Sequence, residues 1–264
     1  MKRLIPFHLW PNVLSIDAPL IALLWQSCLA RICGHPLGFG AQAVLFLSVW
    51  LTYAADHLFD VRGRPEESLH SLRHIWTKRH AARLWTVWFG VLLLDIHLAF
   101  RALEPWQLQQ GAWLLSACLL YTALNQWLSR CWFPKEASVA AIFAAGVLIF
   151  QPLAGQAPSF FLMASVFFLN CLAISLKERP ADAALGHRTL STAEAPNLRR
   201  MVALCLALQL ILFPANPPLA MLTAFSIALL ACQHWKHATL DAGTCHALAD
   251  ACLMPAPLLY CLFG

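Results

Sequence analysis

The chain has 264 residues, of which 60% are hydrophobic and only 12% are charged, and its mean hydropathy is +0.63. A soluble domain of this length carries about a quarter charged residues, so the composition excludes that class and indicates a polytopic membrane protein. The net charge of +5 comes from basic residues between the apolar runs, so we expect no nucleic-acid partner. The ten cysteines show no Cys-x-x-Cys spacing, which is typical of small packing residues rather than a zinc or disulfide framework.

Nine apolar runs approach the length of about 20 residues that a helix needs to cross a membrane, although the seventh and eighth are short. The runs cover residues 11–33, 38–59, 81–103, 106–128, 136–155, 158–177, 198–214, 218–235 and 245–263. We therefore expect an all-α fold, a polytopic helix bundle of about nine transmembrane helices that forms a single integral-membrane domain over residues 1–264. No small-residue cleavage site follows the first run, so we expect it to be a retained helix.

The distribution of Lys and Arg predicts the orientation. If the N-terminus is inside, only Arg31 and Arg101 of the 18 Lys and Arg residues fall in outside segments. Cytoplasmic loops carry the excess of basic residues in membrane proteins. We therefore expect a bacterial cytoplasmic (inner) membrane protein with its N-terminus inside and its C-terminus outside.

Two pairs of carboxylates stand at the ends of apolar runs, Asp56 with Asp60 and Glu178 with Asp182. A spacing of four residues places both members of a pair on one helix face. In the expected topology both pairs lie at cytoplasmic helix ends and precede the longest polar stretches, at about 61–80 and 178–197. Carboxylates at the edge of the hydrocarbon layer are costly unless they are paired, metal-bound or facing water. The two pairs indicate one shared polar site; ordinary helix-end charges with arginine neighbours are the alternative.

Two landmarks recur at nearly equal spacing. Asp56 and Glu178 are 122 positions apart, and Pro11 and Pro134 are 123 apart. Two four-helix halves in the same orientation, followed by a ninth helix, would give this spacing, and chance is the alternative.

The second acidic motif reads E178-x-x-x-D182-x-x-x-G186-x-x-T189-L190. It resembles the second aspartate motif of UbiA-type intramembrane prenyltransferases, in which D-x-x-x-D is followed by a glycine and then Thr-Leu. Asp56 and Asp60 resemble the last two acids of that family's N-D-x-x-D-x-x-x-D motif. Lys135, which follows Pro134, is similar to the family's basic residue at the start of the fifth helix. The helix count and the expected topology also resemble this family.

Two departures accompany the resemblance. Thr52 and Tyr53 stand where the family has its leading Asn and Asp, and the first acid of the second motif is Glu178 rather than Asp. The resemblance implies magnesium-dependent transfer of a prenyl group from a prenyl diphosphate to a lipid-soluble, aromatic acceptor within the membrane. The alternative is a non-catalytic or repurposed UbiA-like protein that binds or transports isoprenoid lipids.

The resemblance also implies roles for particular residues. The acids that would hold Mg²⁺ through the diphosphate, and so serve catalysis, are Asp56, Asp60, Glu178 and Asp182. The basic residues that would contact phosphate are Lys135, Arg62, Arg64, Arg179 and Arg188, since guanidinium groups suit bidentate phosphate contacts. Tyr53 would form part of the wall around the allylic group. For the basic residues the alternative is a topological role with contacts to anionic lipid, or a snorkelling position for Lys135.

Three acids fall inside apolar runs: Asp17, Asp95 and Asp250. An intramembrane acid is a functional hypothesis by default, and hydrogen bonds between helices are the alternative. Asp17 is the best candidate because its expected depth places it near the cytoplasmic side, where the two acidic pairs are expected to form a shared polar site. The histidines at 57, 70, 74 and 80 are expected to be solvated loop residues, because no His-Glu-x-x-His spacing accompanies them.

Overall fold

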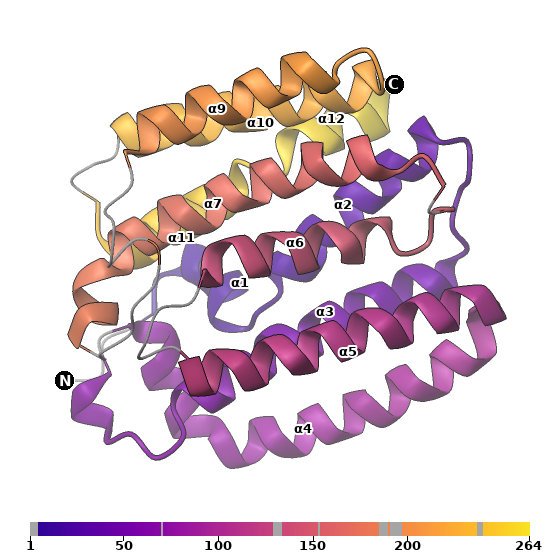
Figure 1. Cartoon of the computed structure of the whole chain (residues 1–264). Coiled ribbons are helices and arrows are strands. Elements are labelled where there is room, and N and C mark those ends of the chain that lie inside the picture. The colour runs from indigo at the N-terminus through magenta and orange to yellow at the C-terminus, as the bar shows by residue number, and fades with distance from the viewer. Residues whose placement is uncertain are drawn as a thin grey trace.

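A computed structural model of the chain describes residues 5–69, 71–128, 134–152, 154–184, 190, 197–236 and 240–264, with the side chains of these residues except 68, 126–128, 180–184 and 236. In this part of the chain all regular secondary structure is helical, which confirms the all-α class (Figure 1). The elements are η1 (Phe7–Leu9), α1 (Trp10–Val13), α2 (Asp17–Ile32), α3 (Phe39–Asp60), η2 (Glu66–Ser68), α4 (Leu72–Ala102), α5 (Pro105–Leu128), α6 (Lys135–Leu148), α7 (Ala157–Ala184), α9 (Leu198–Leu212), α10 (Pro217–Lys236), α11 (Ala242–Ala251) and α12 (Pro255–Phe263).

Every one of the nine expected ranges contains a helix or a pair of helices. Within the described residues, four stretches are long and apolar enough to cross a membrane: Leu72–Ala102, Ala157–Arg179, Pro217–Trp235 and Ala242–Phe263. A fifth span results if Phe7–Val13 and Asp17–Ile32, which are bent by 79°, count as one. The described part of the chain is thus all-helical, with four or five helices that could span a membrane, and it does not establish the expected count of nine.

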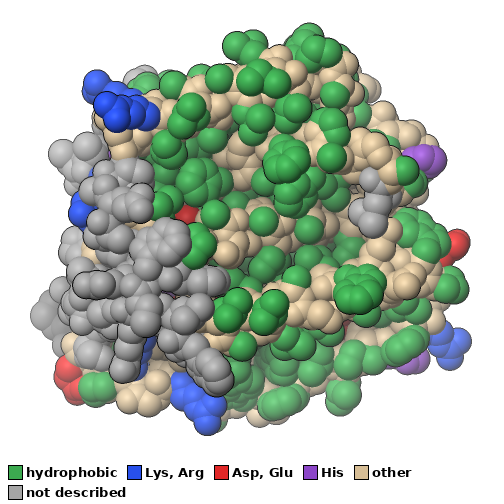
Figure 2. Space-filling model, in the orientation of Figure 1, with side chains coloured by type: hydrophobic (Ala, Val, Ile, Leu, Met, Phe, Trp, Pro, Cys, Tyr) green, Lys and Arg blue, Asp and Glu red, His purple; other side chains and the backbone are tan. Residues whose placement is uncertain are grey.

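Hydrophobic side chains cover the middle of the face shown in Figure 2, and charged side chains lie toward its two ends. Helix α4 and helix α5 contribute large apolar side chains to the surface, among them Leu93, Phe100 and Trp113, which are 70%, 74% and 72% exposed. An apolar surface of this kind is costly in water and suits a hydrocarbon layer.

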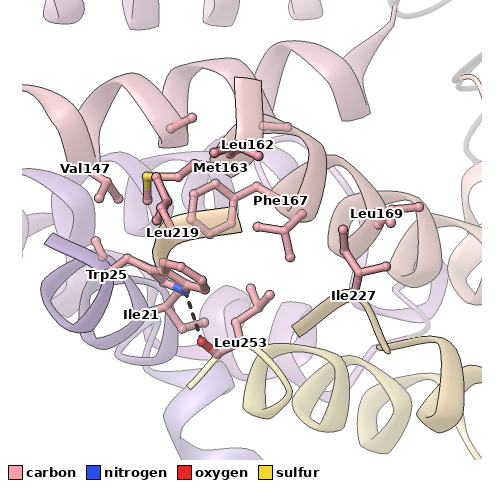
Figure 3. Packing of buried hydrophobic residues seen from close by; sticks show 14 of the residues in the cluster. Ile21, Trp25, Val147, Leu162, Met163, Phe167, Leu169, Leu219, Ile227 and Leu253 are labelled. Atoms are coloured by element: carbon pink, nitrogen blue, oxygen red, sulfur yellow. Dashed lines mark hydrogen bonds between the residues drawn. The ribbon is translucent and has the colours of Figure 1, made fainter. Parts of the chain in front are cut away.

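The core lies between α2, α6, α7 and α10. Trp25 of α2 is completely buried, and so are Leu162 and Met163 of α7 and Leu219 of α10 (Figure 3). The indole nitrogen of Trp25 donates a hydrogen bond to the carbonyl oxygen of Leu253 at 3.0 Å, which ties α2 to the segment between α11 and α12.

The first expected helix is broken at Ser15. This residue has a φ of 57°, a left-handed conformation that is uncommon for a residue other than glycine. The backbone nitrogen of Ser15 donates to the carbonyl oxygen of Asn12 at 3.1 Å, and that of Ile16 donates to the carbonyl oxygen of Pro11 at 2.8 Å. The turn ends α1 and makes Asp17 the first residue of α2.

Two of the expected polar loops are shorter than predicted. Helix α4 begins at Leu72, where the Ser71 hydroxyl accepts a hydrogen bond from the backbone nitrogen of His74 at 3.1 Å and caps the helix. Helix α7 continues to Ala184, so the first part of the 178–197 stretch is helical. The prediction of solvated loop histidines is wrong for His74 and His80, which lie on α4, and for His57, which is only 6% exposed on α3. His70 lies outside the described residues.

Candidate functional site

A cavity of about 170 Å³ lies where α1, α2, α3, α4, α6, α7 and α11 meet. Its polar lining consists of Asn12, Asp17, Asp56, His57, Arg73, Lys135, Glu136, Asn170, Ser175, Glu178, His246 and Asp250. Its less polar lining consists of Ala18, Ile21, Tyr53, Val139, Phe143, Phe167, Cys171, Ile174 and Leu253.

The lining changes from charged to apolar in one direction along the helices. On α6 the charged residue Lys135 begins the helix and Phe143 follows two turns later; on α7 Glu178 lies near the end and Phe167 three turns earlier. Helix α2 also begins with a polar lining residue, Asp17, and continues with the apolar Ile21, whereas α11 contributes the polar His246 and Asp250 and the chain adds the apolar Leu253 only after α11 ends. The cavity is therefore amphiphilic, with a charged region at one set of helix ends and an aromatic region deeper in the bundle.

Six of the residues singled out in the sequence line this cavity together. They are Asp17 of α2, Tyr53 and Asp56 of α3, Lys135 of α6, Glu178 of α7 and Asp250 of α11. Residues from the two acidic motifs, although far apart in the sequence, thus face one space. Their proposed chemical roles stay predictions.

Other predicted residues lie elsewhere. Asp60 is absent from the lining, and its carboxylate oxygen lies 3.6 Å from Nε2 of His74. Arg62, Arg64 and Arg179 do not belong to the lining either, and Arg62 and Arg179 are exposed. The side chain of Asp182 and the whole of Arg188, Gly186 and Thr189 lie outside the part of the chain that the structure describes.

The sequence analysis missed Arg73 and His246, which surround Glu178. A guanidinium nitrogen of Arg73 lies 3.8 Å from Oε1 of Glu178, and Nδ1 of His246 lies 3.4 Å from the same oxygen. Nε2 of His246 lies 3.3 Å from Oδ2 of Asp250, one turn along α11. One imidazole therefore bridges two carboxylates, one of them on another helix. The spacing of His246 and Asp250 on one face of an apolar run was the available signal.

Direct hydrogen bonds hold Asp17 and Asp250, two further carboxylates of the cavity. Asn170 donates to Oδ1 of Asp250 at 2.8 Å. Asn12 donates to Oδ2 of Asp17 at 3.0 Å, and Oδ1 of Asp17 accepts from the backbone nitrogen of Ala18 at 2.9 Å. Buried polar groups need such partners to offset the loss of hydration, so these bonds fix the carboxylates in place before any ligand binds.

His57 lines the cavity from α3, and its ring contacts a residue outside the lining. Its Nδ1 lies 2.9 Å from the hydroxyl of Ser15, the residue with the strained backbone. The third intramembrane acid, Asp95, has a different place: its Oδ2 accepts a hydrogen bond from Ser48 at 2.7 Å, and it does not line the cavity. Asp95 therefore links α3 to α4, as the alternative interpretation of such acids predicts.

The donor groups around the cavity suit magnesium only in part. Among the described side chains, no group of three or more His, Cys, Asp or Glu residues is arranged to hold a metal ion. Magnesium in phosphate sites commonly takes one or two carboxylates and completes its shell with water and phosphate oxygens. Asp56 and Glu178 fit that smaller requirement, and the full set of four acids cannot be assembled without Asp182.

Comparison of the chain with protein-family models, with curated proteins and with solved structures finds no match. The cavity and the sequence motifs that line it are therefore the basis for inferring a function.

Proposed function

We propose that the chain catalyses magnesium-dependent transfer of a prenyl group from a prenyl diphosphate to a lipid-soluble, aromatic acceptor in the membrane. The observation that carries the proposal is the meeting of Asp56, Lys135 and Glu178 at the charged end of one amphiphilic cavity. A ligand with an anionic head and a hydrocarbon tail matches this distribution of side chains.

The residues of the cavity would divide the work of binding. Lys135 and Arg73 supply positive charge for the diphosphate, and Asp56 and Glu178 would hold magnesium. The metal, when bound, neutralises the charge that develops on the departing diphosphate. Asp60 and Asp182 stay proposed metal-binding acids. Arg62, Arg64, Arg179 and Arg188 would contact phosphate where a bound substrate extends beyond the cavity.

The transfer step itself needs an apolar surrounding. The bond between the allylic carbon and the diphosphate oxygen breaks, and its electron pair leaves with the diphosphate. A nucleophilic atom of the acceptor then bonds to that carbon and releases a proton. Tyr53 and Phe143, whose ring centroids are 6.3 Å apart, line the cavity where the allylic carbon would lie. Their π faces can stabilise positive charge on that carbon.

We further propose the UbiA-like arrangement of nine transmembrane helices, with the N-terminus in the cytoplasm of a bacterial cell and the C-terminus outside. Helices in all nine expected ranges and the distribution of Lys and Arg support this arrangement.

Binding to the detergent-purified protein tests the function. A non-hydrolysable prenyl diphosphate analogue is expected to bind in the presence of Mg²⁺ and to be released by EDTA. A folded protein that binds neither short-chain nor long-chain analogues under either condition would refute the proposal.

A second candidate function is binding or transport of isoprenoid lipids without chemistry. Two observations favour it: Glu178 already has Arg73 and His246 as partners, and the Thr52 hydroxyl donates to the Ser48 carbonyl of its own helix at 2.9 Å rather than lining the cavity. Release of diphosphate from an authentic prenyl diphosphate, measured with a range of aromatic acceptors, separates the two. Tight magnesium-dependent binding with no release for any acceptor would favour the second candidate.

A further inference from the structure

The depth of the cavity restricts the size of the hydrocarbon group, given that the site takes a prenyl diphosphate as proposed above. From Lys135 to Phe143 along α6 the helix rises about 12 Å, and from Glu178 to Phe167 along α7 it rises about 16 Å. With C–C bonds of about 1.5 Å, one isoprene unit spans about 5 Å and four units about 20 Å. The whole depth of about 12–16 Å is already shorter than the length of four units, about 20 Å, and the diphosphate occupies the charged part of it, so the remainder suits a short allylic group.

Aromatic rings close the deep end. The rings of Phe143 and Phe167 meet edge to face with centroids 4.6 Å apart, and Phe167 meets Trp25 in the same way at 6.1 Å. Trp25 is completely buried and is held by its hydrogen bond to Leu253 (Figure 3). The fully buried side chain of Met163 belongs to the same packed cluster. A longer chain would have to displace several interlocked side chains, because well-packed cores have few voids.

The volume gives the same limit. An apolar cavity of about 150 Å³ holds one benzene molecule, a group of six carbons. The cavity here has about 170 Å³. Since the diphosphate and the hydrocarbon group share this space, it is too small for a chain of twenty carbons.

We propose that the site is selective for a short allylic diphosphate, with dimethylallyl diphosphate preferred, and that Phe143 and Phe167, supported by Trp25, set the upper limit on chain length. Phe143 is the residue to change first, since it lines the cavity, is only partly buried and contacts both Tyr53 and Phe167.

The experiment compares the binding of two non-hydrolysable probes to detergent-purified protein with Mg²⁺. The probes are dimethylallyl S-thiolodiphosphate, with five carbons, and geranylgeranyl S-thiolodiphosphate, with twenty. The wild-type chain is expected to bind the five-carbon probe at least tenfold more tightly. Phe143→Ala is expected to tighten binding of the twenty-carbon probe at least tenfold, and Phe143→Leu to give a smaller gain in the same direction with less disturbance of packing. Phe161→Ala, on the same α7 as Phe167 but 54% exposed and outside the lining, is the matched control and should keep the wild-type preference.

The outcomes separate this inference from the function on which it rests. Equal or tighter binding of the twenty-carbon probe to the wild-type chain overturns the limit on chain length and leaves the function standing. An unchanged preference for the five-carbon probe in both Phe143 variants overturns the role of the aromatic rings that close the deep end. Failure of the folded wild-type chain to bind either probe overturns the proposed function, and this inference with it.

Discussion

Replacing His246 by leucine should destabilise the protein, because one imidazole serves two carboxylates. The change removes the 3.4 Å contact with Glu178 and the 3.3 Å contact with Asp250. All three side chains are largely buried, with 14%, 26% and 12% of their surfaces exposed. Removing one partner of a buried ion pair costs about 3–5 kcal/mol, because the other charge is left uncompensated. Glu178 keeps Arg73 at 3.8 Å, so we expect the free energy of unfolding to fall by about 3 kcal/mol.

Reversible unfolding of the detergent-purified protein by titration with a denaturing detergent, followed by circular dichroism, measures this loss. The control is Arg79→Gln, which removes an ion pair with Glu66 at the surface, where the side chains of Arg79 and Glu66 are 52% and 40% exposed. Surface pairs contribute little, so this variant should unfold as the wild type does.

A combined variant sharpens the test. Neutralising both acids, Glu178→Gln with Asp250→Asn, in the His246→Leu background should recover part of the lost stability, because no uncompensated charge is then buried. If His246→Leu unfolds like the Arg79→Gln control, or if the combined variant is less stable than His246→Leu alone, the imidazole does not bridge the two acids and the electrostatic description of the cavity is wrong.

Three further predictions concern the fold. Trp25→Phe should lower the free energy of unfolding by about 1–3 kcal/mol in the same assay, because the Leu253 carbonyl loses its hydrogen-bond donor. Trp113→Phe, at a site that is 72% exposed, should change the stability little. Equal effects of the two substitutions would contradict the role of the hydrogen bond. Gly40→Ala would place a Cβ atom 2.5 Å from Cβ of Ala102 and should cost about 1–3 kcal/mol by forcing α3 and α4 apart; Gly90→Ala, which meets nothing within 4 Å, is the control and should not destabilise. Asp241 caps α11 by accepting a hydrogen bond from Thr244, and this bond lowers the pKa of the Asp241 carboxyl. Its stabilisation should be complete above about pH 4, the ordinary range of an aspartate, and should disappear as the pH falls through the lowered pKa of the folded state. Asp241→Asn keeps a cap without this pH dependence, and an unchanged pH profile in that variant would contradict the assignment.

The acidic residues at helix ends could be located from the sequence because helical geometry fixes their face and depth. The four-residue spacing of Asp56 and Asp60 placed both on one side of α3, and the end of an apolar run placed them near a membrane surface. The structure separates the two because one helical turn shifts Asp60 along the axis, where its carboxylate oxygen lies 3.6 Å from Nε2 of His74. Spacing alone gives the face of a helix and not the partner that a side chain meets.

The basic residues were harder to locate for a different physical reason. Arg62 and Arg64 follow the end of α3, so their direction depends on the turn rather than on helical periodicity. Arg73 lies in a polar stretch without the apolar pattern of a membrane helix, but Ser71 caps a helix there and Arg73 lines the cavity. His246 meets a residue 68 positions away, a contact that packing between α7 and α11 creates and local pattern does not reveal.

The proposed function requires that Asp56 and Glu178 serve one magnesium-diphosphate site. The most direct test is calorimetric binding of dimethylallyl S-thiolodiphosphate with Mg²⁺ to the wild-type chain and to Asp56→Asn and Glu178→Gln, with Asp95→Asn as a control acid that lies outside the cavity. Each cavity variant should lose at least tenfold in affinity, the control should bind as the wild type does, and EDTA should abolish binding throughout. Wild-type affinity in both cavity variants, or binding that is indifferent to EDTA, would contradict a shared magnesium-diphosphate site.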